Sequence, residues 1–127
     1  MDGTKILYIE DNLENRTLVK RVLEAEGYVV LEADDGPSGL RIIEEEIPAL
    51  ILMDINLPEI DGYEVTTQLR QMEVLDNVPI VALTANVLRG DRERSLDAGC
   101  DGYIQKPIDV DLLPAQIGAF LRQAQRK

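Results

Sequence analysis

The chain has 127 residues, which suits one domain with a single core and leaves no room for a second domain of ordinary size. Hydrophobic residues make up 45% of it, enough for the chain to fold alone. Its formal net charge of −11 would repel nucleic-acid backbones and anionic lipids. We therefore expect neither direct nucleic-acid binding nor membrane binding.

The first residues and the cysteine count further limit the possible classes of protein. The first residues lack the apolar stretch of a signal peptide, and no run is long enough to cross a bilayer, which predicts a cytoplasmic protein. Cys100 is the only cysteine and there is no histidine, so we expect no internal disulfide and no zinc or haem site. We expect one domain over residues 1–127, with a core at about 5–121 and no output domain, as a monomer or weak dimer.

The first strand and helix follow from their periodicity. An apolar run at residues 6–9 predicts a short strand. Gly27 stands where a glycine commonly closes a helix. The helix between them is expected to bury one face, made of Leu18, Val19, Val22 and Leu23.

A second strand and helix repeat this pattern. Residues 29–31 predict the strand, Gly36 and Pro37 open the helix, and Pro48 ends it. The inward face of this helix is expected to carry Leu40, Ile43 and Ile47.

The middle of the chain contains the stretch ALILMD, in which five apolar residues precede Asp54. This predicts a third strand, followed by a helix with an apolar side at Val65, Leu69 and Met72. Residues 80–83 predict a fourth strand. The segment 87–98 is a weak helix candidate, because it holds an internal glycine and many charges.

A fifth strand is predicted at residues 102–104. The last helix would bury Leu113, Ile117, Phe120 and Leu121. Pro114 leaves its start open, since a start at Val110 would cost a hydrogen bond and a start near Asp111 would not. Five alternations with continuous apolar strands predict a parallel sheet covered on both faces, a doubly wound three-layer α/β/α sandwich.

Four of the five predicted strands are followed by residues with polar chemistry: Glu10 and Asp11, Asp54, Thr84, and Lys106. In such sheets ligands bind at the carboxyl ends of the strands. Carboxylates about 4 Å apart repel by about 4 kcal/mol at an effective dielectric near 20, so a cation must belong to the site. Oxygen ligands favour Mg²⁺, with Mn²⁺ or Ca²⁺ as less specific substitutes.

The remaining two residues point to phosphoryl chemistry. Lys106 adds a second positive charge and Thr84 a hydroxyl donor, a set suited to stabilising three phosphoryl oxygens. Asp54 is then the nucleophile, because a carboxylate can accept a phosphoryl group as an acyl phosphate. We expect Asp54 to be exposed at this edge of the sheet.

Four motifs carry a family resemblance: YIEDN, LILMDINLPEIDGYE, IVALTA and GYIQKP. In this order and on these elements they resemble the receiver domain of two-component response regulators, the flavodoxin-like family that includes the chemotaxis regulator. The resemblance covers about residues 5–121. It implies a five-stranded parallel sheet in the order 2-1-3-4-5.

The resemblance also implies a function. Asp54 would be phosphorylated by a histidine kinase or a histidine phosphotransfer protein, in a signalling phosphoacceptor rather than an enzyme. Only self-phosphorylation from small donors and self-dephosphorylation are expected. Asp11 and Asp54 would bind Mg²⁺ directly, Glu10 through water, and Asn56 through its backbone carbonyl.

Further residues have implied roles in the response. Lys106 would pair with the phosphoryl oxygens, Thr84 would move to donate to one of them, and the backbone N–H of Ala85 would help. Tyr103 would turn inward with Thr84, and so alter the face of the fourth helix, fifth strand and fifth helix for an unknown downstream protein. The bond between Lys106 and Pro107 is expected to be cis.

Plainer explanations exist for single residues. Asp11 or Asn12 could cap the first helix, Asp54 could bond loop amides, Lys106 could be a solvated charge and Tyr103 could fill the core. The conjunction of these residues on successive strand ends favours the functional interpretation.

Other function classes fit less well. An aspartate-nucleophile phosphatase would want an acid at position 56, which is Asn, and a flavin or dinucleotide carrier would want a glycine-rich loop after the first strand. A pseudo-receiver would lack an acid or the lysine. Whether the chain is a stand-alone regulator or a receiver excised from a hybrid histidine kinase stays open.

Overall fold

The structure, a computed structural model, describes residues 3–55, 62–84 and 99–125. Its strands form one parallel sheet in the spatial order β2-β1-β3-β4-β5, as the family resemblance implies. The strands are β1 (Lys5–Ile9), β2 (Val29–Ala33), β3 (Leu50–Asp54), β4 (Ile80–Thr84) and β5 (Gly102–Gln105).

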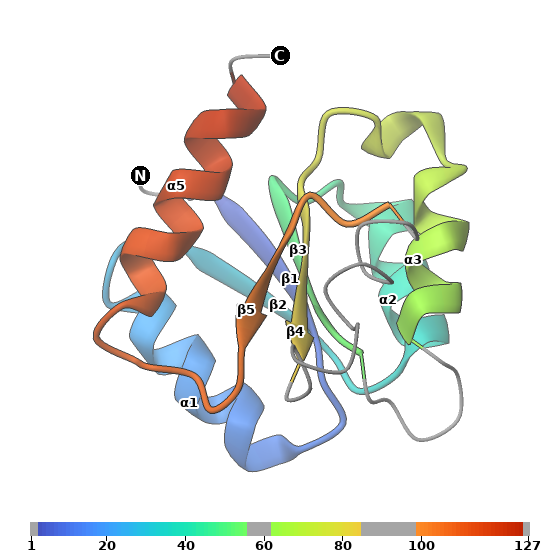
Figure 1. The fold of residues 1–127 in the computed structure, drawn as a ribbon. Helices are drawn as coiled ribbons and strands as arrows, with labels where there is room; N and C mark the ends of the chain where they lie inside the picture. Colours follow the sequence, from blue (N-terminus) through green and yellow to red (C-terminus); the bar gives the residue numbers. More distant parts are fainter. Residues whose placement is uncertain (1–2, 56–61, 85–98, 126–127) are drawn as a thin grey trace.

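Helices cover both faces of the sheet, which confirms the three-layer sandwich (Figure 1). One face is covered by α1 (Leu13–Glu24) and α5 (Leu113–Gln125), and the other by α2 (Gly36–Glu45) and α3 (Gly62–Arg70). A short 3₁₀ turn, η1 (Glu73–Leu75), follows α3. The helix predicted at 87–98 lies outside the described residues. None of the described helices has the length and apolarity of a membrane span.

The core is divided by the sheet into two clusters, because successive side chains of a strand point to opposite faces. In β1, Ile6 and Tyr8 pack on the side of α1 and α5, whereas Leu7 and Ile9 pack on the side of α2 and α3. The free Cys100 is buried in the second of these clusters, and burial raises its pKa to about 11.

Two predictions about helix faces are wrong. Leu18 is 47% exposed, because the buried stripe of α1 runs through Val19 and Leu23 and Leu18 lies beside that stripe. Ile47 is 54% exposed, because α2 ends at Glu45, so the helical periodicity no longer applies at this residue.

Asn12, Gly27 and Pro114 all stand at or near the ends of helices. Asn12 caps α1 through Oδ1, which accepts a hydrogen bond from the amide of Asn15 at 2.9 Å. Gly27 has a φ of 93° and closes the chain after α1, as its position predicts. Because α5 begins at Leu113, Pro114 stands in the first turn, where no helical hydrogen bond is lost.

Candidate functional site

The strand order brings the carboxyl ends of β1, β3, β4 and β5 side by side, at the lower edge of the sheet in Figure 1. Glu10 follows β1, and its amide donates to the carbonyl of Ala33 at 2.9 Å. Asp54 and Thr84 are the last residues of β3 and β4. Lys106 follows β5, and its amide donates to the carbonyl of Thr84 at 2.8 Å. The sequence prediction that these residues share one edge is therefore correct.

Three carboxylates gather at this edge. Glu10, Asp11 and Asp54 each offer an oxygen, and these oxygens all lie within 4.8 Å of one another. Glu10 and Asp54 are buried, whereas Asp11 is exposed. Since Asn12 caps α1, the capping role considered for Asp11 belongs to its neighbour.

A lysine meets the cluster from the end of β5. The Nζ atom of Lys106 lies 2.8 Å from Oδ1 of Asp54, and the bond between Lys106 and Pro107 is cis. The expectation that Asp54 is exposed is wrong, since the residue is only 2% exposed. Its strand is the middle one of five, and the side chain of Lys106 lies against its carboxylate.

The ionisation of Glu10 is strongly perturbed. Burial, followed by the hydrogen bond and the negative charge of Asp54, raises the pKa of Glu10 to about 7. Its Oε1 atom accepts a hydrogen bond from the hydroxyl of Tyr8 at 3.3 Å and one from Nδ2 of Asn15 at 3.2 Å. Burial also raises the pKa of Tyr8, so this hydroxyl stays a donor at neutral pH.

Tyr8 and Asn15 are not among the site residues that the sequence predicts. Tyr8 did carry a signal, because it places a hydroxyl in an otherwise apolar run of a buried strand, where that hydroxyl needs a partner. Asn15 lies one turn into α1 and has no comparable signal.

The two residues expected to respond to phosphorylation lie on neighbouring strands. Thr84 is fully buried at the end of β4. Tyr103 of β5 is half-buried, pairs with Ala82 in register and packs against the core on the side of α2 and α3. The expected contributions of Asn56 and Ala85 lie outside the described residues.

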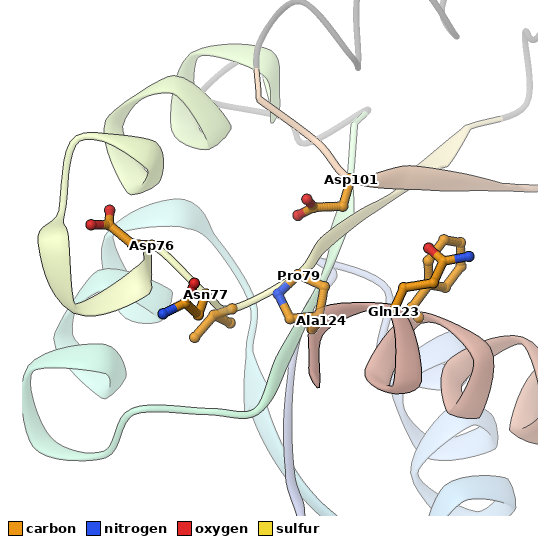
Figure 2. A pocket seen from close by; sticks show the side chains of 8 residues that line it. Asp76, Asn77, Pro79, Asp101, Gln123 and Ala124 are labelled. Atoms are coloured by element: carbon orange, nitrogen blue, oxygen red, sulfur yellow. The ribbon is translucent and has the colours of Figure 1, made fainter. Parts of the chain in front are cut away.

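A cavity of about 430 Å³ adjoins the cluster between α1 and the segment after β5. Its lining is mainly apolar, and the lining residues are Glu10, Asn15, Leu18, Val19, Lys106, Pro107 and Ile108. A smaller cavity of about 250 Å³ lies at the opposite edge of the sheet, between the residues before β4, Asp101 and the end of α5 (Figure 2). Glu10 of the carboxylate cluster and Lys106, which pairs with Asp54, thus also line the larger cavity.

The fold and this cluster agree with a comparison against protein families. The model of the response regulator receiver domain matches residues 6–118. The chain belongs to this family. Receiver domains are signalling modules of two-component systems, which links this one to histidine kinases or phosphotransfer proteins.

Individual relatives agree with this assignment. The receiver is 40% identical over 119 residues to the polar-differentiation response regulator DivK of Brucella ovis, covering 94% of this chain and 97% of DivK. It is also 40% identical to the receiver domain of a sensor histidine kinase from Pseudomonas aeruginosa, with a TM-score of 0.86 and coverage of 94% and 98%. That domain has a magnesium ion coordinated in its active-site cleft.

A third relative shows how well the fold is kept at lower identity. A receiver domain protein from Methanospirillum hungatei is 30% identical, with a TM-score of 0.89 and coverage of 98% of both chains.

Proposed function

We propose that this receiver works in the cytoplasm and accepts a phosphoryl group on Asp54 from a phosphohistidine of a histidine kinase or phosphotransfer protein, in a reaction that requires Mg²⁺. The observation that carries the proposal is the position of the Asp54 carboxylate. It lies in a carboxylate cluster spanning at most 4.8 Å and also 2.8 Å from the ammonium of Lys106.

The residues present fit a hard divalent cation. The cluster offers only carboxylate oxygens, and buried carboxylates this close together need a positive charge. Asp11 and Asp54 would hold Mg²⁺ directly, Glu10 through water, and Asn56 through its backbone carbonyl, with Mn²⁺ or Ca²⁺ as substitutes. When bound, the ion neutralises charge on the phosphoryl group and on the carboxylates.

The proposed reaction is an in-line displacement at phosphorus. An oxygen of Asp54 forms a bond to phosphorus while the bond from phosphorus to the histidine nitrogen breaks, and the leaving imidazole keeps the electron pair and takes up a proton. Lys106 moves its contact from the carboxylate to a phosphoryl oxygen, where its charge stabilises the transition state. The backbone N–H of Ala85 donates to another phosphoryl oxygen.

The response would pass through the two neighbouring strands. Thr84 moves to donate its hydroxyl to the phosphoryl group. Tyr103, on the neighbouring strand, then turns inward. Tyr103 is half-buried, so a turn toward the core would bury more of its ring. The altered face then binds a downstream protein.

The protein that donates the phosphoryl group would bind over the cavity beside the cluster. This cavity is mainly apolar, includes Lys106, and continues toward Leu13 and Leu18, which are 65% and 47% exposed on α1. A donor with an apolar surface around its phosphohistidine could cover these side chains while the phosphoryl group reaches Asp54.

The test is incubation with Mg²⁺ and a small acyl phosphate, followed by intact mass measurement. One added phosphoryl mass is expected, and it should be absent in Asp54→Asn and when the metal is omitted. Asp34→Asn is the matched control, because Asp34 follows β2 at the same edge but is not in the cluster. An adduct that persists in Asp54→Asn, or a wild type that takes up no phosphoryl group, would contradict the proposal.

A further inference from the structure

Tyr8 is an unusual residue for its place in the sheet. β1 has a neighbour on each side, and Tyr8 is fully buried among apolar residues of the cluster beneath α1 and α5. Burying a phenol hydroxyl without a hydrogen bond is unfavourable, and a valine or isoleucine would fill a central strand without this cost. The hydroxyl must therefore have a partner.

That partner is Glu10. Side chains two residues apart in an extended strand point to the same face, so Tyr8 lies directly beneath Glu10. Its hydroxyl donates to Oε1 of Glu10 at 3.3 Å. Asn15, on α1, donates to the same oxygen through Nδ2 at 3.2 Å.

The backbone of Glu10 is held as well. Nη1 of Arg16 donates to the carbonyl of Glu10 at 2.7 Å, and the amide of Glu10 donates to Ala33 of β2 at 2.9 Å. With its main chain tied on two sides, Glu10 moves mainly through rotations of its side chain, and Tyr8 and Asn15 restrict these rotations.

We propose that Tyr8 is a positioning residue, which holds the carboxylate of Glu10 in the orientation that a divalent cation in the cluster requires. A glutamate has one more rotatable bond than an aspartate, so more side-chain freedom is lost when a cation orders it. The hydrogen bond from Tyr8 restricts rotation about this additional side-chain bond of Glu10 before the cation binds. The inference rests on the proposed function, since it assigns Tyr8 to the same metal site.

The test is the affinity of Tyr8→Phe for Mg²⁺, measured from the chemical shifts of the backbone amides as Mg²⁺ is titrated into the protein. This variant removes one oxygen and keeps the ring that fills the core. We expect the dissociation constant for Mg²⁺ to rise by at most about tenfold, the lower end of the effect for partners of direct metal ligands, because Glu10 holds the cation through water. Tyr28→Phe is the matched control, because Tyr28 is half-buried next to the start of β2, at the opposite edge of the sheet. The Mg²⁺ affinity of this control variant should equal that of the wild type.

A double variant separates positioning from core filling. In a Glu10→Ala background the carboxylate is gone, so adding Tyr8→Phe should cause no further loss of Mg²⁺ affinity. Asn15→Ala, at an exposed position on α1, should weaken binding without disturbing the core.

The outcomes distinguish this inference from the proposed function. If the wild type binds Mg²⁺ and Tyr8→Phe binds it equally well, the positioning role is overturned and the proposed function stands. The role is also overturned if Tyr8→Phe weakens binding as much in the Glu10→Ala background as in the wild type. A wild type that does not bind Mg²⁺ would overturn both.

Discussion

Lys106 and Asp54 form an ion pair of 2.8 Å that crosses the end of β4, since Lys106 follows β5 and Asp54 ends β3. The side chain of Asp54 is 3% exposed and that of Lys106 is 24% exposed. The pair between Lys5 and Glu46 has nearly the same length, 2.9 Å, but its side chains are 40% and 45% exposed. Burial should make the two pairs contribute very differently to stability, because solvent screens the exposed one.

Lys106→Ala should therefore lower the free energy of unfolding by about 2 kcal/mol, because it leaves a buried carboxylate without its cation. Lys5→Ala should cost less than about 1 kcal/mol. Urea denaturation without divalent cations measures both. Adding Asp54→Asn to Lys106→Ala should restore part of the loss. Equal losses for the two lysine variants would show that the buried pair has no special role.

The ionisation of Glu10 predicts a pH dependence of stability in the presence of a chelator. Its pKa is about 7 in the folded protein, against an ordinary value of 4.5, so the folded state holds the proton more tightly than the unfolded state. The stabilisation is complete below the ordinary pKa and is lost as the pH rises through about 7. The loss would be at most about 3 kcal/mol for a shift of this size.

Glu10→Gln should flatten this profile, because the amide does not titrate. Thermal or urea unfolding at a series of pH values would show the wild type losing stability across this range, while the variant changes less. Parallel profiles for the two proteins would mean that another group carries the pH dependence.

The sequence was sufficient for the parts of the fold that depend on periodicity and strand ends. Apolar runs predicted all five strands, and the polar residues that follow them predicted the common edge at which Glu10, Asp54 and Lys106 meet. These features are local in sequence, and right-handed crossovers between parallel strands then bring the strand ends together.

The features that were missed depend on tertiary contacts. The burial of Asp54 involves Lys106, whose side chain lies against its carboxylate although the two residues are 52 positions apart in the sequence. Ile47 has the helical spacing of an inward residue, but the chain leaves the helix before reaching it. The hydroxyl of Tyr8 in an apolar run signals that a partner is needed, but the identification of Glu10 as that partner depends on the orientation of both side chains in the folded protein.

The caps of α1 and α2 offer a comparison between a neutral and a charged residue. Oδ1 of Asn12 accepts from the amide of Asn15 at 2.9 Å, and Oδ1 of Asp35 accepts from the amide of Ser38 at 2.8 Å. The hydrogen bonds from Ser38 lower the pKa of Asp35 below its ordinary value.

Asn12→Ala and Asp35→Ala should each cost about 1 kcal/mol at neutral pH. The pH dependence should differ. The contribution of Asp35 is complete above its unfolded pKa and is lost as the pH falls through its lower folded pKa, whereas that of Asn12 does not titrate. Unfolding measured at neutral and acidic pH checks this. A loss for Asp35→Ala that stays constant on acidification would show that its charge does not contribute.

Arg70 joins three segments at the edge opposite the carboxylate cluster. From the end of α3, its Nε donates to the carbonyl of Gly99 at 2.7 Å, and Nη1 and Nη2 donate to the carbonyls of Leu75 and Val78, each at 2.8 Å. Nη2 also pairs with the carboxylate of Asp101, which lines the smaller cavity (Figure 2). The planar guanidinium thus connects α3 to the residues before β4 and β5.

Arg70→Lys should lower the free energy of unfolding by about 2 to 3 kcal/mol, although it keeps the charge. A single ammonium cannot donate along all of these directions, so partly buried carbonyls would lose their donor. Arg41→Lys is the matched control, since Arg41 is exposed on α2 and donates to the hydroxyl of Ser38 at 3.1 Å. It should change stability by less than about 0.5 kcal/mol. Urea unfolding compares the two, and a loss at Arg70 no larger than at Arg41 would mean that charge alone, and not the fork of donors, joins these segments.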